Sequence, residues 1–307
     1  MGLRINNNIE AMVAHRNLLK NDRALSKSLE RLATGQKVNR AADDPAALVI
    51  SEHMRAQVSG MEQAIRNNEV AISLVQTAEG SMNEISALLV NIRQRAISAA
   101  NVGASDEAMT QANQAEIENA LSSIDRIVSS TQFGQYKLLD GTNAEKTKTN
   151  EDGSISIQEG LRFHVGPDAG HTASTSIRDM NTSQLGRATV AEGELPNSSN
   201  FMSLADIDVS TEQGSQDALE IIDQSITEVA TVRGDLGAFQ ANTLESNLTS
   251  LQVAAENMTS AESTLRDTDM AQELATFTRN QIMSQSAAAQ LAQANALPQN
   301  VLRLLNS

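Results

Sequence analysis

The chain contains no cysteine and no tryptophan, and aromatic residues make up only 2% of its 307 residues. The lack of cysteine excludes disulfides, thiolate nucleophiles and thiolate metal ligands. Because large aromatic side chains normally dominate compact cores, a core in this chain must be built from aliphatic residues and methionine. Such a composition favours long helices packed side by side over one thick globule.

Targeting and membrane segments are also missing. The N-terminus has no apolar stretch followed by a small-residue cleavage site, and no run in the chain is apolar and long enough to span a membrane. We therefore expect no membrane anchor and no cleaved signal peptide. If the protein is exported, it uses another route.

Positive charge is scarce in the middle of the chain. The net charge is -15 at pH 7, and residues 140–217 hold thirteen acidic side chains against five basic ones, whereas residues 1–33 hold six basic and three acidic ones. Nucleic-acid binding needs a basic stripe, preferably with stacking aromatics, and the chain has neither. The sequence predicts a solvated acidic middle and argues against DNA or RNA as a partner.

Apolar residues recur at helical spacing through the first part of the chain. A stripe from Ile5 to Leu32 predicts an amphipathic helix that ends at Thr34–Gly35. Asp44–Pro45 supplies a cap and a first-turn proline for a second helix, so residues 34–44 are a predicted linker. Ser105 supplies a cap for a third helix, and Asp106 and Glu107 place two acids at its positive end. We expect this helix to run to Gly134.

The remainder alternates between irregular and helical patterns. From Gly134 to about Gln213 the chain is rich in Gly, Ser, Thr, Asn and acids, and short alternating stretches at residues 154–157 and 161–165 indicate hairpins. Helical periodicity returns from Leu219 and continues to the C-terminus. The predicted fold is mainly α, a long antiparallel helical bundle or coiled coil from both chain ends, with a short β-hairpin and a loop-rich middle segment.

The apolar stripes predict two kinds of packing. Within a helical rod we expect Ile72, Val75, Leu89, Ile92, Ile226, Leu236 and Leu251. At the chain ends, a two-helix pair with wide stripes leaves apolar surface that another copy must cover. The predicted polymerisation interface comprises Ile5, Ile9, Met12, Leu18, Leu25, Leu29, Leu32, Leu274, Phe277, Leu291, Val301, Leu302, Leu304 and Leu305. Small residues in the segment 284–294 predict close helix packing there.

No catalytic constellation stands out. The metalloprotease motif His-Glu-x-x-His is absent, and no nucleophile with a base is recognisable. His164 and His171 flank Asp168 and could be imagined as metal ligands, but histidines in a loop-rich segment are more often solvated. His15 and His53 have no partner at ligand spacing. We therefore expect no enzyme, no cofactor and no metal.

Both ends carry recognisable sequence signatures. Asn6–Asn8 leads into the first helix, the segment 29–46 reads LERLATGQKVNRAADDPA, and residues 76–80 read QTAEG. Near the C-terminus, residues 291–302 read LAQANALPQNVL. In order and position these segments closely resemble bacterial flagellin at both ends.

This resemblance implies a structural subunit that is exported unfolded and polymerises through its terminal helices into the extracellular flagellar filament used for motility. Residues 1–44 and 267–307 would form the two halves of an inner helical tube, and residues 45–133 and 214–266 the two halves of an outer helical rod. Residues 134–213 would be a hairpin and loop-rich segment facing solvent. A hook–filament junction protein, which shares the helical ends, is the alternative.

The resemblance also implies partners. Besides further copies of the chain, these are a flagellar export chaperone, the export apparatus, and the cap and junction proteins. Arg93 and Glu116 match the surface that a Toll-like receptor reads on enteric flagellins, but Val90, Asn91, Gln94 and Arg95 depart from it. We therefore expect weak or absent receptor signalling. Candidate O-glycosylation acceptors in the middle segment are Thr172, Ser174, Thr175 and Ser176.

Overall fold

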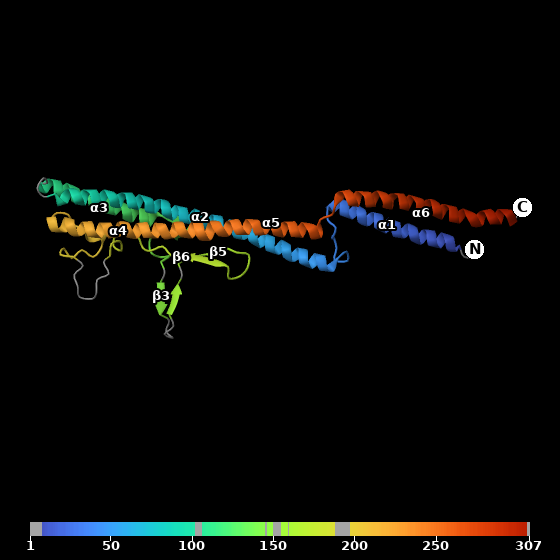
Figure 1. Ribbon diagram of the computed structural model, residues 1–307, viewed down its shortest axis with the longest axis horizontal. Coiled ribbons are helices and arrows are strands. Elements are labelled where there is room, and N and C mark those ends of the chain that lie inside the picture. Colours follow the sequence, from blue (N-terminus) through green and yellow to red (C-terminus); the bar gives the residue numbers. More distant parts are fainter. Residues whose placement is uncertain are drawn as a thin grey trace. The chain divides into compact units, whose positions relative to one another are not determined.

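Figure 1 shows the computed structural model of the chain, which describes residues 8–101, 106–144, 146–149, 155–158, 160–187 and 197–305. Of residues 146–149, 155–158 and 297–305 it describes the backbone alone. The chain forms two compact units, Met1–Ser59 with Ala255–Ser307, and Gly60–Ala254. The units divide inside two long helices, whereas the boundaries drawn from the sequence lie at residues 44 and 266. In the part that is described, no helix is long and apolar enough to cross a membrane.

The first unit is built on α1 (Ile9–Thr34) and α6 (Met270–Leu305), which lie side by side and antiparallel (Figure 1). The Asn8 side chain caps α1 by accepting a hydrogen bond from the backbone N of Ala11, at 3.0 Å. Gly35 closes the helix with a left-handed φ of 72°, which confirms the predicted end. The first turns of α2 (Pro45–Ala100) and the end of α5 (Ser246–Arg266) complete the unit.

The second helix also begins as predicted. Asp44 Oδ1 accepts hydrogen bonds from the backbone N of Ala46 and of Ala47, at 3.1 and 3.0 Å. Pro45 occupies the first position of α2, where its missing N–H costs nothing. The linker between α1 and α2 is therefore the short segment that the capping residues predicted.

The second unit packs the rest of α2 and α5 with α3 (Glu107–Ser130) and α4 (Glu212–Phe239) around an aliphatic core (Figure 1). Of the predicted rod residues, the structure places Val75, Leu89, Ile92 and Leu236 at 0 or 1% exposure, Leu251 at 8%, and Ile72 and Ile226 half-buried. Asp106 caps α3 by accepting a hydrogen bond from the backbone N of Met109, one residue after the cap predicted at Ser105, which lies outside the described residues.

The predicted end of α3 at Gly134 was wrong. The helix ends at Ser130, because Thr131 turns to an extended conformation while its Oγ1 and backbone N both bond to the Ile127 carbonyl. A two-residue hairpin follows, with β1 (Gln132–Phe133) antiparallel to β2 (Tyr136–Lys137). Gly134 lies in its turn with a φ of 64°. Gly134 therefore marks the hairpin turn and not the end of the helix.

Two further antiparallel strand pairs lie in the middle segment. β3 (Lys146–Thr149) pairs with β4 (Ile155–Gln158), and β5 (Leu161–His164) pairs with β6 (Thr172–Thr175). The strands β4 and β5 coincide with the two alternating stretches of the sequence, which confirms that they form hairpins. The described residues thus hold three small strand pairs rather than one.

Much of the middle segment does not face solvent as its composition suggested. Its buried apolar side chains, each 3% exposed or less, are Leu138, Leu139, Ile177, Met180, Leu185, Leu204, Ile207 and Val209. The 3-10 turn η1 (Leu204–Asp206) lies among them. These side chains are too widely spaced to give a periodic signal, so only tertiary packing reveals that they belong to the core.

The β5–β6 hairpin docks beside a π-helical segment, η2 (Gln240–Glu245), between α4 and α5. The rings of Phe163 and Phe239 lie 6.3 Å apart, centroid to centroid. The side-chain amide of Asn247 donates to the Val165 carbonyl at 2.6 Å, and that of Asn67 donates to the His164 carbonyl at 3.1 Å. The helical periodicity of the sequence did not predict the π-helical segment η2.

Two glycines of the second unit should respond in opposite ways to alanine. Gly186 has a φ of 67°, and an added Cβ would lie 2.6 Å from Ser225 Oγ and 2.7 Å from Ile221 Cγ2. We expect Gly186→Ala to lower the free energy of unfolding by more than about 2 kcal/mol. Gly80 lies inside α2 with open space around it, so Gly80→Ala should raise that energy by about 0.5–1 kcal/mol. Urea unfolding followed by circular dichroism measures both, and shifts of the same sign would contradict the prediction.

Candidate assembly surface

Small side chains form the seam between α1 and α6. Ala14, Ala287 and Ala294 are 9%, 7% and 8% exposed, and Ser28 is 3% exposed. This confirms the close packing predicted for residues 284–294, since the separation of two helices follows the size of the side chains between them. Among the described side chains of these two helices, the buried apolar ones are thus alanines, and the larger ones are at most half-buried.

Polar side chains hold the two helices in register. The Asn8 amide donates to the Ala294 carbonyl at 2.8 Å, and the Asn21 amide donates to the Met283 carbonyl at 3.2 Å. Next to the second contact, Ser284 Oγ donates to Asp22 at 2.7 Å. The pair is therefore fixed by directional contacts along its length and not only by apolar burial.

Several predicted polymerisation residues are open to solvent. Ile9, Met12, Leu29 and Leu274 are 58%, 69%, 54% and 52% exposed. The half-buried members of the predicted set are Leu18, Leu25, Leu32, Phe277 and Leu291. Ile5 and the side chains of Val301, Leu302, Leu304 and Leu305 lie outside the described residues. Their role in polymerisation stays a prediction.

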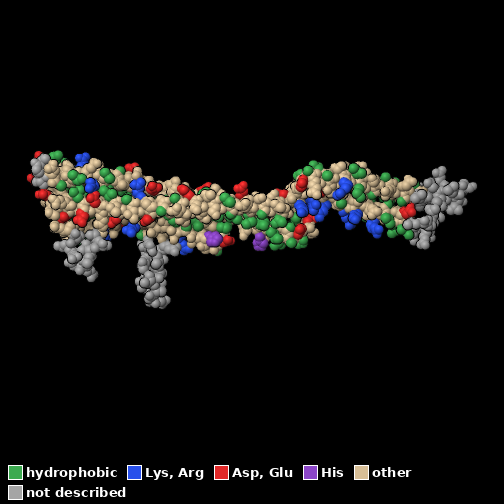
Figure 2. All heavy atoms as spheres, viewed as in Figure 1, with side chains coloured by type: hydrophobic (Ala, Val, Ile, Leu, Met, Phe, Trp, Pro, Cys, Tyr) green, Lys and Arg blue, Asp and Glu red, His purple; other side chains and the backbone are tan. Residues whose placement is uncertain are grey.

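The structure adds five exposed apolar residues that the sequence stripe did not include. They are Val13, Leu19, Met270, Ile282 and Met283, between 41 and 58% exposed. We call the exposed apolar side chains of α1 and α6 the terminal apolar surface; it comprises Ile9, Met12, Val13, Leu19, Leu29, Met270, Leu274, Ile282 and Met283. Figure 2 shows apolar side chains at the surface of these helices among lysines and arginines.

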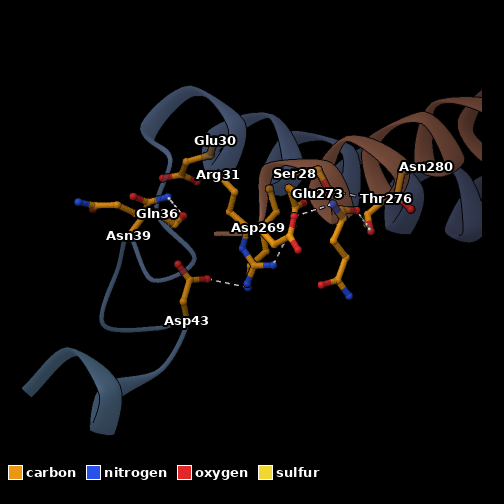
Figure 3. Close-up of polar contacts among 12 residues, drawn as sticks. Ser28, Glu30, Arg31, Gln36, Asn39, Asp43, Asp269, Glu273, Thr276 and Asn280 are labelled. Carbon is orange, nitrogen blue, oxygen red and sulfur yellow. Dashed lines mark hydrogen bonds and ion pairs between the residues drawn. The ribbon is translucent and has the colours of Figure 1, made fainter. Parts of the chain in front are cut away.

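A polar cluster surrounds the C-terminal end of α1 (Figure 3). Arg31 lies 3.6 Å from Glu273 on the first turn of α6, and Glu273 is only 8% exposed. Arg40 pairs with Glu30 at 2.9 Å, which ties the linker back to α1. The linker after α1 also contacts the end of α5, because the backbone N of Lys37 donates to the Arg266 carbonyl at 2.6 Å.

Asp43 is a titratable member of this cluster. Its carboxylate accepts a hydrogen bond from Lys27, 2.6 Å away, which lowers the pKa of Asp43 below its ordinary value despite an opposing effect of burial. A lowered pKa means that this contact stabilises the fold above the unfolded-state pKa and is lost as the pH falls through the folded-state pKa.

We expect Lys27→Gln to raise the pKa of Asp43, because the ammonium that stabilises the carboxylate is removed. An NMR titration of the Asp43 carboxyl carbon in both proteins measures the change, with Asp106, which lies in the second unit, as the internal reference. An unchanged Asp43 midpoint would mean that Lys27 does not hold the carboxylate in solution.

The two candidate receptor residues are both engaged within the second unit. Arg93 pairs with Asp223 on α4 at 2.6 Å, and Glu116 on α3 pairs with Arg95 on α2. Arg95 is one of the residues at which the sequence departs from the recognised form. Weak or absent receptor signalling stays a prediction, and the pairing of Glu116 with Arg95 gives it a further physical reason, since a receptor would have to compete for that carboxylate.

The other candidate residues lie near the β5–β6 hairpin. Thr172, Ser174 and Ser176 are exposed and Thr175 is half-buried, so glycosylation there stays a prediction. His164 and His171 are exposed, and the described residues contain no group of three His, Asp or Glu side chains that could hold a metal ion.

Both helical ends of the chain match known protein families. A family model described as the bacterial flagellin N-terminal helical region matches residues 5–144, and one described as the C-terminal helical region matches residues 219–305. A solved structure described as a flagellar hook-associated protein of Vibrio parahaemolyticus covers 73% of this chain and 100% of its own, with a TM-score of 0.55 at 15% identity. At that identity the likeness concerns the fold alone.

Relatives of similar length are much closer in sequence. A protein named flagellin from Bacillus subtilis is 41% identical over 99% of this chain and 100% of its own length. The flagellar filament 31.3 kDa core protein of Treponema maltophilum is 37% identical over 98% of this chain and 99% of its own. The chain therefore belongs to the bacterial flagellin family.

Proposed function

We propose that the chain is a structural subunit of a bacterial flagellar filament and that it polymerises through the terminal apolar surface. The observation that carries the proposal is the exposure of large apolar side chains on two helices whose mutual seam is filled by small ones. Soluble monomers seldom expose so many large apolar side chains on one pair of helices unless a partner covers them. The relatives named flagellin and filament core protein support a second copy of the chain as that partner.

Polymerisation supplies the burial that the helix pair lacks. Covering one Ile, Leu or Met side chain is worth about 1.5–3 kcal/mol, while ordering the backbone of one residue costs about 1–2 kcal/mol. A pair with few buried large side chains is thus marginal in the free subunit and is stabilised when neighbours cover its surface.

The family also bears on where the subunit acts. Membership supports assembly with further copies as part of an extracellular flagellum. Export in an unfolded state, a dedicated export chaperone and contacts with the export apparatus, the cap and the junction proteins belong to the same proposal. The chain's lack of cysteine suits such export, since no disulfide has to be broken before the chain is threaded. No observation favours the junction-protein alternative.

Negative-stain microscopy and sedimentation of the purified chain test this function. The monomer, seeded with short filament fragments of the same chain, is expected to grow into long filaments that sediment. A chain that stays monomeric at every concentration, or that forms only short capped complexes on filaments of another flagellin, would overturn the proposal.

We also propose that the chain has no catalytic role. Filaments of the purified protein are expected to cleave neither casein nor a panel of peptides above the background of a mock purification. Protease activity that disappears in the His164→Ala or His171→Ala variant would contradict this.

A further inference from the structure

Methionine residues differ widely in exposure. In the terminal apolar surface, Met12, Met270 and Met283 are 69%, 46% and 48% exposed. In the core of the second unit, Met82 and Met180 are 0% and 1% exposed. Oxidation of a thioether requires access of the oxidant to sulfur, so the first three are open to it in the free subunit and the last two are protected.

Two of these methionines have an aliphatic neighbour one helical turn away in the same surface. Met12 lies one turn from Ile9, and Met270 one turn from Leu274. Met283 adjoins Ile282 in the sequence of α6, and both side chains are exposed. On α6, the side chains of Met270, Leu274, Ile282 and Met283 are all between 46 and 58% exposed. An oxygen atom added to any of the three sulfurs would therefore lie on the exposed apolar surface of α1 and α6.

We propose that Met12, Met270 and Met283 are three oxidation-sensitive positions of the terminal apolar surface, at each of which a two-electron oxidant of the peroxide class prevents incorporation of the subunit into a filament. Hydrogen peroxide transfers one oxygen atom to the thioether sulfur, which is oxidised to the sulfoxide, and the peroxide is reduced to water. The inference rests on the proposed function, because it requires that polymerisation buries this surface.

The sulfoxide acts through burial. It replaces an apolar sulfur by a strong hydrogen-bond acceptor, and burying an acceptor without a donor is unfavourable. We expect each sulfoxide to weaken incorporation at least about tenfold, which corresponds to about 1.4 kcal/mol. In a finished filament the same three sulfurs are covered, so their oxidation should be slower there than in the monomer.

A partition experiment on the wild-type chain tests the inference. Monomer is treated with hydrogen peroxide until each molecule carries fewer than one sulfoxide on average, quenched, and mixed with filament fragments of the unoxidised chain. After growth, pellet and supernatant are digested with trypsin and sulfoxide occupancy is measured by mass spectrometry. The spacing of lysine and arginine puts each methionine of the chain on a separate tryptic peptide, so every site is read independently.

Sulfoxide at Met12, Met270 and Met283 is expected to be at least about tenfold rarer in the pellet than in the supernatant. Met109 and Met202 of the second unit, 49% and 51% exposed, provide the comparison and should show equal occupancy in both fractions. Equal occupancy in both fractions at all five sites, or the same depletion at all five, would overturn the assignment.

Two leucine variants of the full chain give a second readout, because leucine conserves the volume of methionine. Met12→Leu/Met270→Leu/Met283→Leu should grow at the same rate before and after peroxide, whereas Met109→Leu/Met202→Leu should remain sensitive. If the triple variant grows poorly even without peroxide, the partition of sulfoxides in the wild-type chain is the measurement that tests the inference. If unoxidised wild-type monomer does not grow, the proposed function fails, and this inference fails with it. If it grows and its sulfoxides partition evenly, only this inference fails.

Discussion

The Ile282→Asp variant is expected to remain a soluble helical monomer and to lose polymerisation. Ile282 is 58% exposed, so in the free subunit the substitution removes little packing and lowers helix stability only slightly through the poorer helix propensity of aspartate. In a filament, the variant loses the burial of isoleucine, worth about 1.5–3 kcal/mol, and must also desolvate a carboxylate. Since about 1.4 kcal/mol is tenfold in affinity, we expect the critical concentration to rise at least about a hundredfold.

Ile282→Leu is the matched control, because it keeps an apolar side chain of the same volume at the same position. Both variants are compared by circular dichroism for helix content and by seeded sedimentation for growth. If the aspartate variant still forms filaments at wild-type concentrations, Ile282 does not belong to the polymerisation surface. If it loses most of its helix signal, the defect lies in folding and not in assembly.

Replacing Ile92 by alanine should strongly lower the free energy of unfolding of the second unit. Ile92 is 1% exposed in the core shared by the long helices, and truncating a buried isoleucine to alanine costs about 2–5 kcal/mol. The loss combines the apolar area no longer buried with the cavity that remains. Urea unfolding of the monomer measures it as a lower midpoint at an unchanged slope.

Ile97→Ala is the control for this prediction. It removes the same atoms from the same helix, but Ile97 is 46% exposed, so its effect should stay within about 0.5 kcal/mol. Similar losses for both variants would mean that the core does not lie where the structure places it. A larger loss for Ile97 than for Ile92 would reverse the assignment of the two helix faces.

Capping chemistry made the helix ends readable from sequence. Gly35 closes α1, and Asp44 and Pro45 open α2, each by contacts within a few residues along the chain. For α3 the predicted cap at Ser105 was one residue from the observed one at Asp106. Gly134 shows where such local reasoning stops. A glycine with positive φ serves a helix end and a hairpin turn equally well, and the choice depended on the strand pairing of residues 132–137.

Periodicity, caps and signature motifs are local properties. They therefore predicted the helical class of the chain, most of its helix boundaries, its aliphatic core composition and its resemblance to flagellin. Which apolar side chains are covered follows instead from tertiary packing. It filled the α1–α6 seam with alanines and left Ile282 and Met283 exposed, and it drew Leu138 and Ile177 into the core. It also paired Glu116 with Arg95. Burial and ion pairing depend on which surfaces meet after folding, and residues far apart in a sequence carry no local signal of that meeting.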